Sequence, residues 1–137
     1  MAAKRKDTPA AEPALPPTEG TQGKRVPAIF FRTESGEPLR EWLKSLPPED
    51  RKLIGEDIKT VEFGWPVGMP VCRSLGDGIY EIRTHLTQGI ARVLFYIDAK
   101  RRMVLLHGFV KKTQKTPLND LELARRNKSK HERGLSQ

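Results

Sequence analysis

The sequence predicts an α+β fold: a mostly antiparallel sheet of four to five strands, with a helical hairpin before it and a helix after it. Two observations predict this fold. Residues 38–63 carry apolar side chains at helical spacing, with a Pro-Pro break in the middle. Residues 70–110 hold short apolar or alternating runs separated by turn signals, which is typical of strands joined in a meander. We expect the helices to lie on one face of the sheet and the other face to stay partly open.

The 137 residues suffice for one domain. Residues 1–25 are rich in Pro and Ala and have too little apolar surface to fold, so we predict a disordered tail there. The domain is expected over residues 26–127. Residues 128–137 are predicted to be a polar, basic tail in which the last helix frays.

The first strand is predicted over the apolar run 27–31, and its leading proline suits an edge position. The turn signal at 35–38 then begins a helix. Its apolar residues share one face at helical spacing: Leu39, Trp42, Leu43 and Leu46.

A second helix begins at the Pro47-Pro48 pair, which also ends the first. Acidic residues follow in its first turn, where the helix dipole favours negative charge. Ile54, Ile58 and Val61 continue one apolar face, and Gly64 ends the helix. Two such helices need a sheet to cover their apolar faces.

Four strands are predicted in the second half, over 70–75, 79–85, 90–98 and 103–110. The second of them alternates, with one polar face made of Glu81, Arg83 and His85. The last two are almost continuously apolar, which indicates strands buried on both faces. Thr116-Pro117 then begins the final helix.

Positive charge gathers at the C-terminal end of the chain. The formal net charge is +8, and residues 111–137 hold eight basic and three acidic residues, a net charge of +5. Residues 26–110 are nearly neutral, with twelve basic and eleven acidic residues. This distribution favours a polyanionic partner.

Several classes of protein are excluded or disfavoured. No apolar run is long enough to span a membrane, and no apolar segment follows the basic N-terminus, so we expect a cytoplasmic protein without a secretory signal. The single cysteine, Cys72, allows no internal disulfide or Cys-based zinc finger and is predicted to be a small buried hydrophobe. The three histidines are dispersed, and no Gly-rich phosphate loop occurs, so neither a metal nor a cofactor is predicted.

Cations near the strand ends are the candidate site. Arg92 is the one charge inside an apolar strand, so it either pairs with Glu81 or Asp98 as a structural ion pair or serves a binding site. The other candidate cations are Arg73, Arg83, Lys111, Lys112 and Lys115. Guanidinium and ammonium groups bind phosphate and stabilise the charge that develops when RNA is cleaved. Glu81 and His85 are candidates for the acid and base of such a reaction, while His107 in its apolar strand is predicted to be a hydrogen-bonded core residue.

Three stretches, residues 74–83, 91–96 and 105–117, closely resemble the RelE/HigB-like toxins of type II toxin–antitoxin systems, in particular their phage-derived branch. The similarity covers roughly residues 26–126, and Gly-Phe-Val-Lys-Lys-Thr-Gln-Lys-Thr-Pro over 108–117 is its most specific part. It implies the RelE/ParE-like fold. It also implies a metal-independent endoribonuclease that cleaves mRNA on the ribosome, inhibits translation and is neutralised by a cognate antitoxin.

The resemblance also implies roles for particular residues. Arg83 and Arg92 match the strand cations of the RelE-type site, and Lys111 and Lys112 match the basic pair after the last strand, so these four are the catalytic candidates. Lys115, His85 and Arg73 are then the RNA-binding candidates. RelE has a lysine where this chain has Glu81, and a tyrosine in the region of Pro117 and Leu118, so no general acid or base is carried over; His131 could substitute if the C-terminal end folds back.

Three functions stay open at this point. The first is a ribosome-associated ribonuclease toxin whose partners are mRNA, the ribosome and an antitoxin, expected to be a helix-turn-helix protein. The second is a ParE-like inhibitor of DNA gyrase, and the third is a non-catalytic module that binds an antitoxin or RNA. The basic run after the last strand favours the first. If so, we expect Arg92→Ala to abolish growth inhibition by a protein that stays folded.

Overall fold

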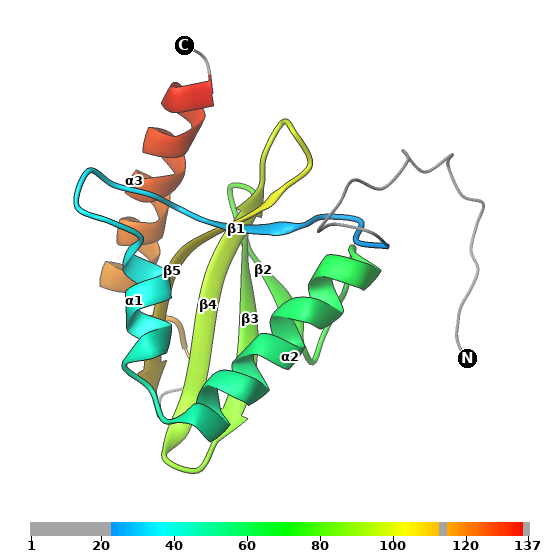
Figure 1. Ribbon diagram of the computed structural model, residues 1–137, viewed down its shortest axis with the longest axis vertical. Helices are drawn as coiled ribbons and strands as arrows, with labels where there is room; N and C mark the ends of the chain where they lie inside the picture. Colours follow the sequence, from blue (N-terminus) through cyan, green and yellow to red (C-terminus); the bar gives the residue numbers. More distant parts are fainter. Residues whose placement is uncertain (1–22, 113–114, 136–137) are drawn as a thin grey trace.

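The computed structural model describes residues 23–112 and 115–135. Most of the predicted N-terminal tail lies outside them. The described elements are β1 (Ala28–Phe30), α1 (Pro38–Lys44), α2 (Pro48–Gly64), β2 (Cys72–Gly76), β3 (Ile79–Leu86), β4 (Gly89–Ile97), β5 (Met103–Lys111) and α3 (Leu118–Leu135). They form the predicted α+β fold, with two helices before the main sheet and one after it (Figure 1).

The five strands form one sheet in the order β1-β5-β4-β3-β2. Strand β1 pairs with β5 in parallel, and every other pair is antiparallel. The edge position predicted for the first strand is therefore confirmed. Pro27 offers no backbone N–H there, and the N–H of Ala28 donates to the Glu62 carboxylate at 2.7 Å, which satisfies part of the open edge.

The two faces of the sheet bury two separate cores. Val93 and Phe95 of β4 pack with Ile54 and Ile58 of α2, so α1 and α2 cover one face (Figure 1). The alternate residues of the same strand, Leu94 and Tyr96, pack with Ala124 of α3 on the other face, together with other apolar residues of that core. The expectation that all helices lie on one face is thus wrong. Strands apolar on both faces need a cover on each, and α3 supplies the second.

Helix α3 is longer than the sequence predicts. It continues to Leu135 instead of fraying from Asn127, so residues 128–135 are helical and do not belong to a tail. Two polar contacts explain this: the buried Asn127 side chain donates to the Leu106 carbonyl at 2.9 Å, and His131 Nε2 lies 3.1 Å from Asp98 Oδ2. No helix in the described part of the chain is long and apolar enough to cross a membrane.

Smaller differences concern boundaries. Helix α1 ends at Lys44, yet Leu46 still packs against the core under α1 and α2. Strand β2 begins at Cys72, two residues after the expected start at Pro70, which has no N–H to donate. Ordered contacts begin before Val26, because the Arg25 N–H donates to the Glu62 carbonyl at 2.7 Å.

Candidate functional site

Charged side chains gather on the face of β2, β3 and β4 that α3 covers only in part. In the register of the sheet Arg73 lies opposite Glu81, and Arg83 lies opposite Arg92. Residues opposite each other in register share a face, and Glu81 and Arg83 share one because they are two positions apart. Two cations directly opposite each other repel, so the pair of arginines requires an anion nearby. We call these four residues the arginine–glutamate cluster.

Glu81 supplies that anion from a fully buried position. Its Oε1 lies 3.4 Å from Arg83 Nε, and its Oε2 lies 3.6 Å from Arg92 Nε. The hydroxyl of Thr116, just before α3, donates to the same carboxylate. Neither Glu81 nor Arg92 has exposed surface. Glu81 is therefore arranged as a counter-ion, which speaks against its candidacy as acid or base.

Arg92 thus forms the ion pair with Glu81 that the sequence left open, and not the one with Asp98. Burial lowers the pKa of the Arg92 guanidinium from its ordinary value, Glu81 opposes this shift, and the cations Arg83 and Arg73 add to it. Because Arg92 is enclosed, it offers no exposed surface for direct contact with a ligand. Arg83, whose side chain is 12% exposed, is the member of this pair that reaches solvent.

A bulge in β5 brings a second group to the same face. Along β5 the register steps from His107, opposite Leu94, to Leu105, opposite Phe95, and passes over Leu106. An extra residue reverses the side-chain alternation from that point on. Leu106 and Phe109 accordingly both pack in the core under α3. Without the bulge, His107, Phe109 and Lys111 would face α1 and α2.

Asp120, in the first turn of α3, contacts His107 and Lys111 of this second group. His107 Nε2 lies 2.7 Å from Asp120 Oδ1, and Lys111 Nζ lies 3.3 Å from Asp120 Oδ2. The His107 side chain is 19% exposed and that of Asp120 is 14% exposed, so the pair lies at the border between the core and solvent. One carboxylate therefore holds a histidine and a lysine side by side.

The ring of Phe109 links the two groups. It stacks on His107 with 5.5 Å between ring centroids, and Lys111 Nζ lies 5.7 Å from its centroid. Arg92 Cζ lies 5.8 Å from the same centroid, and Phe109 is the partner of Arg92 in the register. The arginine–glutamate cluster and the His107–Asp120 pair are therefore in contact through Phe109, and we call the face that they share the cation surface.

The remaining candidate cations surround this surface. Lys111 is 48% exposed at the end of β5, and Lys112 follows it in an exposed position. Lys115 is exposed just before α3, and His85 is exposed on the cluster's side of β3, two positions beyond Arg83. The fold therefore brings Arg73, Arg83, Arg92 and Lys111 together, with Lys112, Lys115 and His85 at the margin.

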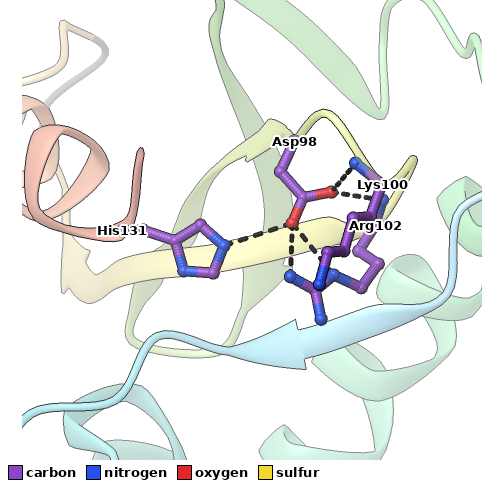
Figure 2. A network of polar contacts seen from close by, with 4 residues as sticks. All are labelled: Asp98, Lys100, Arg102 and His131. Carbon is purple, nitrogen blue, oxygen red and sulfur yellow. Dashed lines mark hydrogen bonds and ion pairs between the residues drawn. The ribbon is translucent and has the colours of Figure 1, made fainter. Parts of the chain in front are cut away.

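His131 does not belong to this site. It contacts Asp98, which directly follows β4 and is six residues from Arg92, roughly 20 Å at the rise of a strand. Figure 2 shows the Asp98 carboxylate accepting from the backbone of Lys100, from the backbone and guanidinium of Arg102, and facing His131. Burial raises the pKa of Asp98, but the hydrogen bonds from Arg102 and His131 outweigh it and hold the pKa below its ordinary value. His131 is thus an anchor of α3.

Two further features lie apart from the cation surface. A cavity of about 1270 Å³ is lined by the β1 edge, the loop after it and the end of α3, and none of the predicted catalytic or RNA-binding residues lines it. Cys72 is buried, as predicted, and burial raises the pKa of its thiol to about 11, so it is no nucleophile. Among the described residues, no three His, Cys, Asp or Glu side chains group as a metal site requires.

The sequence reasoning missed the role of Asp120, Thr116 and Phe109 and treated His107 as part of the core. One signal was present: His107 and Lys111 both precede a helix whose first turn carries an acidic residue. Strict alternation along the strand, however, places His107 and Lys111 on the same face as Leu105. Only the bulge turns them toward Arg92 and α3.

Comparison with known proteins gives one family. The family described as phage-derived protein Gp49-like (DUF891) matches residues 41–129. That range runs from α1 into α3 and includes every residue of the arginine–glutamate cluster and of the His107–Asp120 pair. No curated protein matches the chain significantly.

Proposed function

The chain belongs to the phage-derived Gp49-like family, which is associated with toxin–antitoxin systems, and from this premise we propose that it is a toxin that cleaves RNA. The proposed reaction is metal-independent cleavage of mRNA on the ribosome, which stops translation. A cognate antitoxin, expected to be a helix-turn-helix protein, would neutralise it. The RelE/HigB-like resemblance of residues 74–117 supports the finer assignment.

The observation that carries this proposal is the gathering of cations on one partly open face. Arg73, Arg83, Arg92 and Lys111 lie on neighbouring strands, and these four cations exceed the carboxylates of Glu81 and Asp120 that contact them. The excess positive charge suits a phosphodiester, and it would stabilise the further negative charge that develops on phosphorus during cleavage. An open surface, unlike a closed pocket, admits a polymer.

The buried ion pair supports a second candidate function. Because Arg92 and Glu81 form an ion pair without exposed surface, the cluster could serve a structural role alone and leave a module that binds an antitoxin or RNA without cleaving it. A ParE-like gyrase inhibitor finds no specific support among the described residues. The ribonuclease, the binding module and the gyrase inhibitor predict different outcomes in the following experiment.

The experiment is induced expression in a bacterium with mapping of mRNA 5′ ends. We expect growth arrest and new ends inside translated frames, and we expect Arg83→Ala to reduce these ends by about a hundredfold, because one stabilising donor of transition-state charge is lost. Arg51→Ala is the matched control, since Arg51 is exposed on α2 at the opposite face of the sheet and should leave cleavage unchanged.

The other outcomes separate the alternatives. Intact mRNA with blocked gyrase would contradict the ribonuclease and support the ParE-like function. Intact mRNA without growth arrest would leave only the binding module. Equal cleavage by Arg83→Ala and the parent would show that the cation surface is not the site.

A further inference from the structure

We infer that His107 is the general base of the proposed cleavage and that Asp120 is its positioning residue. The inference rests on the proposed function and adds the one group that the cation surface lacks. The arginines and lysines of that surface bind phosphate through their N–H donors but do not serve as proton acceptors, and the Glu81 carboxylate is fully buried. RNA cleavage by the neighbouring 2′-hydroxyl needs a group that accepts a proton.

The geometry of His107 suits this role. With its Nε2 2.7 Å from Asp120 Oδ1, the neutral ring donates Nε2–H to the carboxylate and keeps the lone pair on Nδ1. A carboxylate that holds an imidazole in one tautomer is the arrangement by which catalytic bases are oriented. The Phe109 ring stacks on the face of the imidazole and restricts its orientation.

His107 also lies where a phosphate-bound substrate would be. Asp120 contacts both His107 and Lys111, so the imidazole and a half-exposed ammonium are held by one carboxylate. The Phe109 ring contacts both the imidazole, with 5.5 Å between ring centroids, and Arg92, whose Cζ lies 5.8 Å from its centroid. His85, the other histidine near the cluster, is exposed on β3, and no acidic partner orients it in the described contacts.

The proposed step balances as follows. Nδ1 of His107 takes the proton of the 2′-hydroxyl, and the 2′-oxygen forms a bond to phosphorus. The bond from phosphorus to the 5′-oxygen breaks, and this oxygen leaves with a proton from water. The imidazolium returns its proton to the hydroxide so formed. The products are a 2′,3′-cyclic phosphate and a 5′-hydroxyl end.

The test uses the full chain in a translation reaction with a defined mRNA and measures the single-turnover cleavage rate and the affinity for ribosome-bound mRNA. We expect His107→Gln to lower the rate by about a hundredfold or more. Affinity should stay within about twofold, because the phosphate contacts belong to the cations.

His131→Gln is the matched control, because His131 also pairs with an aspartate, Asp98, but at the far end of α3. It should cleave at the parent rate. If His107→Gln does not fold, as judged by circular dichroism, Asp120→Asn takes its place. That variant should lower the rate with affinity unchanged, because the carboxylate no longer selects the tautomer.

The outcomes separate this inference from the proposed function. Cleavage by His107→Gln at the parent rate overturns the inference and leaves the ribonuclease intact. A parallel loss of rate and affinity assigns His107 to binding and likewise overturns it. Absence of cleavage by the parent overturns the proposed function, and the inference falls with it.

Discussion

Arg92 has no exposed surface, and the Glu81 carboxylate lies 3.6 Å from its Nε. Removing the Arg92 guanidinium should destabilise the fold, because the Glu81 carboxylate stays buried and loses one of the two arginines that it pairs with. This burial argues against the expectation that Arg92→Ala stays as stably folded as the parent. Arg83, which reaches solvent, tests the surface with less disturbance.

We therefore predict that Arg92→Ala lowers the free energy of unfolding by about 3 kcal/mol. The double variant Glu81→Leu/Arg92→Leu should recover at least part of that loss because the buried carboxylate is removed together with Arg92, while Arg83 still reaches solvent. Urea denaturation of the three proteins measures both effects. An unchanged urea midpoint for Arg92→Ala would mean that the pair contributes nothing to stability.

At the scale of the elements, strand β5 depends on a close approach to α1. A Cβ atom added at Gly108 would lie 2.4 Å from Cζ3 of Trp42 and 2.6 Å from its Cε3. Gly108 of β5 is opposite Val93 of the central strand β4 in the register, so the ring of Trp42 covers β5 next to the centre of the sheet. Glycine at this position lets α1 lie directly on β5, one residue from His107 and Phe109.

Gly108→Ala should lower the free energy of unfolding by about 1–3 kcal/mol, because the ring of Trp42 must move out of a packed position. Gly55→Ala is the matched control: nothing lies within 4 Å of the added Cβ, in the interior of α2. It should stabilise the protein by about 0.5–1 kcal/mol through higher helix propensity. Thermal unfolding of both variants compares them; a tolerated Gly108→Ala would show that Trp42 has room to move.

Helix α3 is held at its C-terminal half by the buried Asp98 carboxylate, whose pKa lies below its ordinary value (Figure 2). A lowered pKa means that the folded state favours the ionised carboxylate. Its contribution to stability is therefore complete above the unfolded pKa of about 3.9 and is lost as the pH falls through the lower folded pKa.

Asp98→Asn should accordingly lower the free energy of unfolding by about 2 kcal/mol near pH 7, since hydrogen bonds to a charged acceptor become neutral ones. The difference from the parent should shrink between about pH 4 and pH 2, as the carboxylate protonates. Denaturation curves across this range measure it. A difference that grew toward acid would contradict the assigned sign.

At the scale of the whole molecule, the cation surface and the large cavity lie in two different regions. The cation surface lies over β2, β3, β4 and the end of β5, whereas the large cavity lies at the β1 edge beside the end of α3. Residues 111–137 carry a net charge of +5, and much of it belongs to α3 and to the segment that enters it. A polyanion would therefore be attracted to the face of the sheet that α3 covers.

If RNA binds there, each lysine that contacts a phosphate contributes to the salt dependence of binding. We predict that Lys112→Ala reduces the slope of log affinity against log salt concentration by about 1 and weakens binding to different RNA sequences alike. Lys59→Ala, an exposed lysine on α2 at the opposite face, is the control and should leave the slope unchanged. Equal slopes for all three proteins would place the RNA elsewhere.

The sequence by itself determined the element order, the edge position of β1 and the burial of β4 and β5, because these follow from local periodicity and from prolines and glycines. It also identified the cations that the sheet gathers. Only the tertiary structure decided that α3 covers the second face, that Arg92 pairs with Glu81 and not with Asp98, and that the β5 bulge turns His107 toward Asp120. The physical reason is that these outcomes depend on contacts between residues distant in sequence and on a one-residue register shift, neither of which leaves a mark in local periodicity.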